Sequence, residues 1–393
     1  MSLSVFFSSV SLPHFTPEGG LFHSQIGASV RVHDKGFPDL EDDRPDIALF
    51  GVMDGRMAVG NQGCADAAEA VRKHLYTLYQ GEYNLRLADL GNIMPGETVT
   101  DTYAAVKTVC NELIRSGIVP VIIGGGQDLT YAQYLAYEKL EQKVEVSVID
   151  SRFDLDQENT ESAPLNSQTY LNHIILHEPD YLFNLSSLAY QTYFASKESI
   201  AMYDKLYFNT MRLGLIAGKV DHVEPIIRAA DMVSFDISAI RFSDAPGSAY
   251  VTPNGLFGHE ACQICRYAGM SDKLTSIGFY EYNPALDSRE QTAILLSQMI
   301  WYFIDGFYSR KHDAPLVPKS AYITYRTTLH DDAYELVFVK SKKSDRWWMQ
   351  VPYPGGRSVN ERYHLVPCRY EDYQTAVSGE MPDLWWKTHQ KLT

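Results

Sequence analysis

Short apolar runs alternate with amphipathic stretches along most of this chain. Apolar runs of strand length lie at residues 47–52, 84–90, 119–123, 144–150, 232–237 and 274–280. Apolar residues recur with helical spacing at residues 65–79, 100–116, 129–140, 259–269 and 289–307. Strands that alternate with helices form parallel sheets with helices on both faces. We therefore predict an α/β fold of three layers (α/β/α) with a doubly wound, mostly parallel sheet.

The two ends of the chain lack this alternation. Residues 1–44 are rich in Ser, Pro, Gly and His and read as an irregular N-terminal arm, which places the α/β domain at residues 45–310. Residues 311–393 form a C-terminal appendage, with a predicted hairpin at 334–339 and 347–351 and short helices at 370–377 and 383–391. We expect this appendage to pack on the α/β domain or on a neighbouring subunit through its large aromatic side chains, Trp347, Trp348, Trp385 and Trp386.

Charge and composition narrow the classes of partner. The chain has 49 acidic and 34 basic residues and a formal net charge of -15, which disfavours nucleic acid and anionic membranes as partners. No apolar stretch approaches the roughly 20 residues of a membrane span, and the start of the chain lacks the pattern of a signal peptide. The five cysteines have no disulfide-framework spacing. We expect a cytoplasmic protein.

Carboxylates follow two of the predicted strands. Residues 150–154 read Asp-Ser-Arg-Phe-Asp, and Asp236 directly follows the largely apolar residues 232–235. Open α/β sheets build their ligand sites at the carboxyl ends of the strands, and oxygen ligands that converge there suit a hard cation. Arg152, however, stands in the middle of the first cluster, and Ser238 stands where another carboxylate would complete the second.

Several motifs in unbroken order carry a family resemblance. Gly124–Asp128 reads GGGQD, where formimidoylglutamases carry G-G-G-H-E, and Asp150–Asp154 stands where the family has D-A-H-x-D. Ser234–Ser238 matches S-x-D-x-D except at its last position, and Glu281–Asp287 is close to E-x-N-P-x-x-D. Over residues 45–308 the chain resembles the ureohydrolase superfamily of arginase, agmatinase and formimidoylglutamase, which implies an arginase-like fold.

The resemblance implies a site for two Mn ions that ionise a bridging water, which attacks a guanidinium or formimino carbon. Three of the six family ligand positions match, and three do not. The first metal would use Asp150, Asp154, Asp236 and the neutral amide of Gln127. The second would need a ligand at Arg152, and a guanidinium does not coordinate a cation. We expect Arg152, and with it Arg241, to act as a counter-ion in place of the metal, with the Arg152 guanidinium paired with Asp150 and Asp236.

The resemblance also implies substrate contacts. Glu281 would grip the cationic group of a substrate, and Asn283 and His173 lie where the family places further pocket residues. The catalytic candidates are thus Asp150, Asp154, Asp236 and Glu281, in vestigial or altered form. Simpler interpretations stay open: an Asp at a strand end also caps backbone amides in any α/β protein, Glu281 could be solvated, and His173 could be a surface residue.

Two functions are compatible with this pattern. We favour a family member that has lost the dinuclear Mn site and ureohydrolase activity and acts as a binding or structural protein, with no cofactor. The alternative is an active formimidoylglutamase-like hydrolase of linear amidine C–N bonds with one divalent cation, Mn or Mg. The expected partner is a small ligand or a protein, and a homo-oligomer is left open.

Overall fold

A ten-stranded sheet forms the centre of the protein in a computed structural model, which describes residues 3–140, 142–156, 162–314, 319–329, 334–353 and 363–392. The strands lie in the order β1-β4-β3-β5-β10-β9-β6-β7-β8, with β2 beside β4. Their pairs are parallel except for β1 with β4. The strands are β1 (Phe7–Ser8), β2 (Arg31–Val32), β3 (Ile47–Val52), β4 (Leu87–Ile93), β5 (Val119–Ile123), β6 (Val144–Ile149), β7 (Leu182–Tyr190), β8 (Asn209–Arg212), β9 (Met232–Asp236) and β10 (Ser276–Tyr280).

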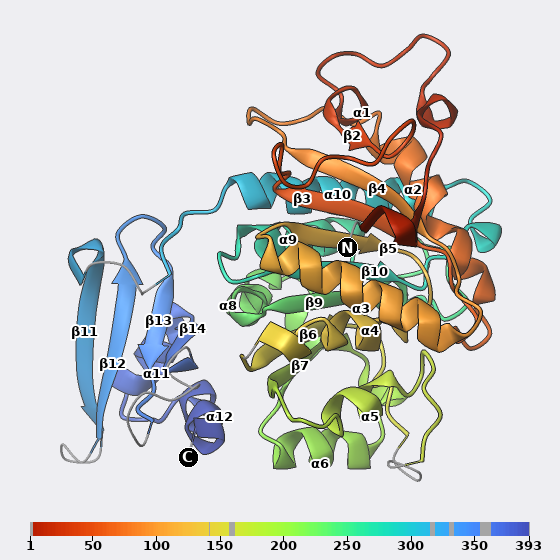
Figure 1. Cartoon of the computed structure of the whole chain (residues 1–393). Helices are drawn as coiled ribbons and strands as arrows, with labels where there is room; N and C mark the ends of the chain where they lie inside the picture. The colour runs from red at the N-terminus through yellow and green to blue at the C-terminus, as the bar shows by residue number, and fades with distance from the viewer. Residues whose placement is uncertain are drawn as a thin grey trace.

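Helices cover both faces of the sheet, and Figure 1 shows α3 crossing in front of it. One hydrophobic cluster packs one face of the sheet against α2 (Ala67–Leu75), α8 (Glu224–Ala229), α9 (Gly258–Met270) and α10 (Gln291–Tyr308). A second cluster packs the other face against α3 (Val99–Arg115), α4 (Leu129–Leu135), α5 (Tyr170–Ile175) and α6 (Lys197–Lys205). The predicted three-layer fold is therefore confirmed. The short helices α1 (Ile26–Ser29) and α7 (Leu213–Ile216) complete this part of the chain.

The strands consist of apolar runs because both of their faces are covered. All residues of β3, β5, β9 and β10 are buried, as expected for parallel strands between two layers of helices. None of the helices in the described ranges is long and apolar enough to span a lipid bilayer.

The C-terminal residues form a second, antiparallel sheet in the order β11-β12-β13-β14, drawn in blue beside the main sheet in Figure 1. Its strands are β11 (Tyr322–Leu329), β12 (Tyr334–Ser341), β13 (Trp347–Gln350) and β14 (Leu365–Cys368), followed by α11 (Tyr370–Val377) and α12 (Asp383–Leu392). We call β11 to α12 the C-terminal module. The predicted hairpin is the β12–β13 pair, and both predicted short helices are present.

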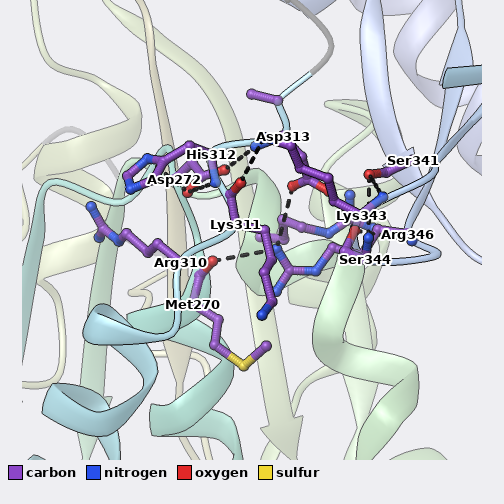
Figure 2. A network of polar contacts seen from close by, with 12 residues as sticks. Met270, Asp272, Arg310, Lys311, His312, Asp313, Ser341, Lys343, Ser344 and Arg346 are labelled. Atoms are coloured by element: carbon purple, nitrogen blue, oxygen red, sulfur yellow. Dashed lines mark hydrogen bonds and ion pairs between the residues drawn. The ribbon is translucent and has the colours of Figure 1, made fainter. Parts of the chain in front are cut away.

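The module packs against the amino ends of the central strands. The Trp348 ring lies 4.4 Å from the guanidinium carbon of Arg228 in α8, and Tyr363 stacks on Phe183 of β7 with ring centroids 3.9 Å apart. Figure 2 shows the neighbouring polar contacts, in which the Asp313 amide donates to Asp272, just before β10, over 3.0 Å. The four tryptophans divide: Trp347, Trp348 and Trp385 are buried, whereas Trp386 is 50% exposed.

Candidate metal and substrate site

The register of three central strands brings the predicted acidic residues together at the carboxyl edge of the sheet. Ile149 of β6 pairs with Phe235 of β9, and Asp236 pairs with Tyr280 of β10. The residues that follow, Asp150 and Glu281, therefore emerge on either side of Asp236. Asp154 returns to the same place from the loop after β6, and all four carboxyl groups are buried.

Asp150, Asp154 and Asp236, which we call the aspartate trio, form a compact oxygen cluster. One carboxylate oxygen from each residue lies within 4.8 Å of the others. Backbone amides orient two of the carboxylates: the amide of Arg152 donates to Asp150 Oδ1 over 2.9 Å, and that of Ser238 donates to Asp236 Oδ1 over 2.6 Å. The loops after β6 and β9 thus hold these oxygens in place.

Gln127 is fully buried beside this cluster. Gly124 and Gly125 before it have φ angles of 87° and 79°, and a Cβ at Gly125 would lie 2.1 Å from a Leu129 methyl group, so the turn requires glycine. The Gln127 Nε2 donates to Ser234 Oγ over 2.9 Å and to the Tyr170 hydroxyl over 3.3 Å. Its Oε1 has no partner among the described residues.

Glu281 is positioned by a strained backbone and by two neutral donors. Its φ angle is 65°, a conformation that non-glycine residues adopt mainly where the surroundings enforce it. The Gln127 amide donates to Glu281 Oε1 over 2.9 Å, and Asn61 Nδ2 donates to Oε2 over 2.7 Å. Asn283 in turn donates to Asn61 Oδ1 over 3.0 Å. Asn283 therefore supports Glu281 through Asn61.

Burial raises the pKa of every carboxyl group in this site. The pKa values of Asp154 and Asp236 lie well above their usual range because of burial and the charge of Asp150. Burial also raises the pKa of Asp150, although Asp154 and the Arg152 amide offset part of the effect. The pKa of Glu281 rises to about 7 by burial, against the hydrogen bonds from Asn61 and Gln127. The pocket thus favours protons or another cation among these carboxylates.

The donor set fits one hard divalent cation. Asp150 Oδ2 and Gln127 Oε1 are buried oxygens without a hydrogen-bond partner in the described part of the chain. Together with Asp154 and Asp236 they provide three carboxylates and one amide oxygen, the ligand types that Mg²⁺, Ca²⁺ and Mn²⁺ prefer. A second cation lacks such a set: Ser238 offers a hydroxyl, which lies 3.1 Å from the Ser151 hydroxyl and 3.4 Å from Asp150 Oδ1.

The Arg152 guanidinium forms no ion pair with Asp150 or Asp236, although its charge offsets part of the rise in the pKa of Asp150. Its guanidinium carbon lies 4.0 Å from the centroid of the Phe194 ring, and Nη1 donates to Ser151 Oγ over 3.2 Å and to the Tyr250 carbonyl over 3.4 Å. The side chain thus takes up an aromatic platform beside the trio instead of pairing with Asp150 and Asp236. Its contact with Asp150 is made by the backbone amide.

Arg241, the second expected counter-ion, is also paired elsewhere. Its Nε lies 2.8 Å from Asp244 Oδ1, and its guanidinium stacks 3.8 Å from the Phe257 ring centroid. Asp244 lies in the same loop and is close enough in sequence to capture the arginine locally, so Arg241 does not neutralise the trio.

His173 lies on α5 but contacts other groups. Its Nε2 is 3.0 Å from the Ala163 carbonyl oxygen, and its ring packs against Tyr131. The same helix reaches the site through Tyr170, whose hydroxyl contacts Gln127. Sequence reasoning missed Tyr170 and Asn61 as site residues; Asn61 lies in a loop after β3 that gives no signal of its distant partner Glu281.

The fold and the site together describe an α/β/α protein with buried carboxylates at the ends of adjacent parallel strands. The sequence profile of the arginase family matches residues 45–305, and the chain belongs to the arginase family.

One protein of known sequence and two solved structures are similar to this chain. A formimidoylglutamase of Staphylococcus aureus (strain MRSA252) is 26% identical over 253 residues, which cover 62% of this chain and 80% of that protein. The structure of formimidoylglutamase from Bacillus subtilis superposes with a TM-score of 0.66 at 19% identity and covers 76% of this chain and 98% of that one. Trypanosoma cruzi formiminoglutamase with Mn²⁺ gives a TM-score of 0.63 at 20% identity, covering 70% and 97%. At these identities the structures establish a shared fold.

Proposed function

We propose that this protein is a hydrolase of linear amidine C–N bonds, of formimidoylglutamase type, that works with one divalent cation. The observation that carries the proposal is the aspartate trio itself. Three buried carboxylates lie within 4.8 Å of one another, and the arginine expected to neutralise them stacks on Phe194 instead. Buried like charges repel one another unless they take up protons or a cation, so the trio calls for a cation from outside the chain.

The residues divide into two roles. Asp150, Asp154, Asp236 and Gln127 would hold the cation, which when bound lowers the pKa of a water and supplies the nucleophile. Glu281 would accept hydrogen bonds from the amidinium group of the substrate and fix its carbon next to that water. Asn61 and the Gln127 amide hold both oxygens of Glu281, so the carboxylate is oriented before a substrate arrives.

A non-catalytic binding role is the second candidate. Its support is Ser238, a hydroxyl where the family motif has a carboxylate, together with Arg152 where that motif has a histidine. A family member with these residues would lack the second Mn²⁺, and binding without turnover would follow if one cation does not activate water. This is the loss of ureohydrolase activity that the sequence pattern favours.

Metal content and hydrolysis together separate the two candidates. Protein stripped with EDTA and reloaded with Mn²⁺ or Mg²⁺ should retain one ion per chain by elemental analysis and release formamide from formimidoylglutamate. Asp154→Asn should lose both properties. Asp244→Asn is the matched control, because Asp244 pairs with Arg241 outside the trio. Two ions per chain would contradict the single-cation site, and one ion without turnover would favour the binding role.

A further inference from the structure

The candidate site is closed to solvent. Gln127 is fully buried, and the side chains of Asp150, Glu281, Asp236 and Asp154 are 2, 2, 5 and 7% exposed. A hydrated cation or an amidine is larger than a gap that leaves so little surface open. Either one therefore reaches these side chains only if part of the covering structure moves.

Tyr250 lies at the edge of this site, in the loop after β9. Its side chain is partly exposed, and Arg152 Nη1 donates to its carbonyl oxygen over 3.4 Å. Burial and the negative charges of Glu281 and Asp154 raise the pKa of Tyr250, against the opposing charge of Arg152. The phenol is therefore close to the buried carboxylates on one side and open to solvent on the other.

The Tyr250 side chain reaches across the site to a loop on the opposite side. Its hydroxyl donates to the carbonyl oxygen of Val59, in the loop after β3, and the Val59 amide donates to Ser167 Oγ over 3.0 Å. The strand order places β5 and β10 between β3 and β9. Adjacent strands lie about 4.8 Å apart, so a contact between the loops after β3 and β9 passes over the ends of β5 and β10. Gln127 and Glu281 follow these two strands, and the contact covers them.

The loop that carries Tyr250 is anchored on both sides of it. The Gly247 amide donates to Thr292 Oγ1 over 2.8 Å, and the Phe242 amide donates to the Thr252 carbonyl oxygen over 2.7 Å. A hydrogen bond from a partly exposed hydroxyl to a carbonyl oxygen is weak in water. The Tyr250 side chain can therefore turn away from the opposite loop while the anchors stay in place.

We propose that Tyr250 is the gate of the candidate site. With its hydroxyl on the Val59 carbonyl oxygen, the side chain closes the path to the aspartate trio, and its rotation away from Val59 opens that path. The identity of the molecules that enter, a divalent cation and an amidine, rests on the proposed function. The gate itself rests on the contacts of Tyr250 and is tested separately.

The rates of Mn²⁺ binding test the gate. Tyr250→Phe keeps the ring and removes the hydrogen bond to Val59. A gate that does not contact the cation changes the barriers to entry and exit equally. The association and dissociation rate constants should therefore both rise, about 2- to 10-fold for the loss of one neutral hydrogen bond, while Kd stays within about twofold of wild type. Stopped-flow mixing of metal-free protein with Mn²⁺ and a fluorescent metal indicator gives the association rate constant, and release from loaded protein into excess EDTA gives the dissociation rate constant.

Tyr193→Phe is the matched control. The Tyr193 hydroxyl accepts a hydrogen bond from Asn254, in the same loop as Tyr250, but Tyr193 follows β7, so this contact does not cross the ends of β5 and β10. Both of its rate constants should equal those of wild type. Tyr250→Ala also removes the ring, and both of its rate constants should exceed those of Tyr250→Phe.

Two results would overturn the gate. A higher Kd with an unchanged association rate constant in Tyr250→Phe would show that Tyr250 positions the ligands of the cation. Unchanged rate constants in both Tyr250→Phe and Tyr250→Ala would show that the cation enters by another path.

Hydrogen exchange separates the gate from the proposed function. The amides of Arg152 and Ser238 donate to two carboxylates of the trio, so they exchange with solvent when the site opens. In metal-free protein, mass spectrometry should show exchange of these amides about 2- to 10-fold faster in Tyr250→Phe than in wild type or Tyr193→Phe. If wild-type protein binds no Mn²⁺ but shows this difference, the proposed function fails and the gate stands. If amide exchange and the Mn²⁺ rate constants are both unchanged, the gate is wrong.

Discussion

At the residue scale, the protein contains two groups of buried charged residues, the Arg72–Asp89 pair and the aspartate trio, which differ in how their charges are neutralised. Arg72 is completely buried and donates to Asp89 Oδ2 over 2.7 Å and to Oδ1 over 2.9 Å. Its remaining N–H groups reach Asn92 Oδ1 and the Gly91 carbonyl oxygen over 2.6 and 2.9 Å. This cluster joins α2 to β4. The aspartate trio, by contrast, forms no ion pair with an Arg or Lys side chain in the described part of the chain, and burial raises the pKa of all three carboxyl groups.

Replacing Arg72 with Met should destabilise the protein by about 3–5 kcal/mol, because it leaves Asp89 buried without its counter-charge. Urea unfolding followed by circular dichroism measures this change. Arg86→Met is the matched control: Arg86 pairs with Asp46 but its side chain is 45% exposed, and an exposed pair contributes about 0–1 kcal/mol. Similar losses of unfolding free energy in the two variants would show that the buried Arg72–Asp89 pair stabilises the protein no more than an exposed pair does.

The sequence correctly predicted the positions of site residues that the backbone fixes. It was less reliable for long side chains, which can adopt several orientations. Asp150, Asp236 and Glu281 follow apolar strands, and adjacent parallel strands bring such positions together whatever the side chains do. The position of the Arg152 side chain was predicted wrongly because this long side chain could reach either the carboxylates or an aromatic ring. The ring, Phe194, lies in a short 3₁₀ helix after β7, which no sequence motif indicated. The stacked position avoids taking the charge fully out of water.

At the element scale, sequence patterning did not predict the strand β7 at its full length of nine residues. Its polar residues Asn184, Ser186 and Ser187 interrupt the apolar run, yet all nine residues of the strand are buried. Partners on neighbouring elements satisfy them: Ser187 Oγ lies 2.6 Å from the Tyr203 hydroxyl of α6. A polar residue in a strand is tolerated when another element supplies a hydrogen bond, and the sequence of the strand alone does not reveal that partner.

The C-terminal helix α12 also meets β7 through a half-buried lysine side chain. Lys391 donates to Asn184 Oδ1, and its ammonium lies 5.9 and 6.0 Å from the Phe183 and Phe208 ring centroids. Burial lowers the pKa of Lys391 to about 7, against the opposing charge of Glu145. The junction therefore favours the neutral amine.

This lowered pKa gives a stability that depends on pH. Between pH 7 and the usual lysine pKa of about 10.4, the unfolded chain binds more protons at this site than the folded one. The contribution of Lys391 to the free energy of unfolding therefore rises with pH across that window. Lys391→Met should remove this rise, so that the difference in stability between wild type and variant changes from pH 7 to pH 9. Urea unfolding at both values measures it.

A control separates this effect from a general loss of charge. Lys205 ends α6 and is exposed, so Lys205→Met should leave the pH dependence of the unfolding free energy as in the wild-type protein. An unchanged pH dependence in Lys391→Met would show that the ammonium stays solvated at the junction.

At the scale of the whole molecule, the sequence predicted more of the secondary structure at the C-terminal end of the chain than at the N-terminal end. The N-terminal arm adds β1 and β2 to the main sheet beside β4, although its composition predicted only irregular structure. Two-residue strands carry too few residues for a periodic pattern. The C-terminal hairpin and helices were predicted from patterning, whereas β11 and β14 were not. The division of the chain after residues 44 and 310 stays a prediction.

The site and the C-terminal module lie at opposite edges of the same strands. The module contacts Arg228 and Phe183 near the amino ends of the central strands, and Asp313, just before the module, contacts Asp272, while the aspartate trio lies at the carboxyl ends. Attachment of the module therefore does not require the trio. Changes at the junction should alter stability while leaving cation binding intact.

Trp348 gives the sharpest test of that attachment. Its ring is 4% exposed and stacks on the Arg228 guanidinium, so Trp348→Ala should lower the free energy of unfolding by about 3–5 kcal/mol, the usual range for a buried large aromatic. Trp386→Ala is the matched control in the same module, because Trp386 is 50% exposed and surface changes stay within about 0.5 kcal/mol. Urea unfolding measures both changes in the free energy of unfolding, and limited proteolysis should release a fragment of module size earlier in Trp348→Ala than in Trp386→Ala.

The Mn²⁺ content of folded Trp348→Ala should equal that of the wild-type protein, since the aspartate trio lies at the other edge of the sheet. Equal stability losses in the two tryptophan variants would show that the module is held by contacts other than this stack.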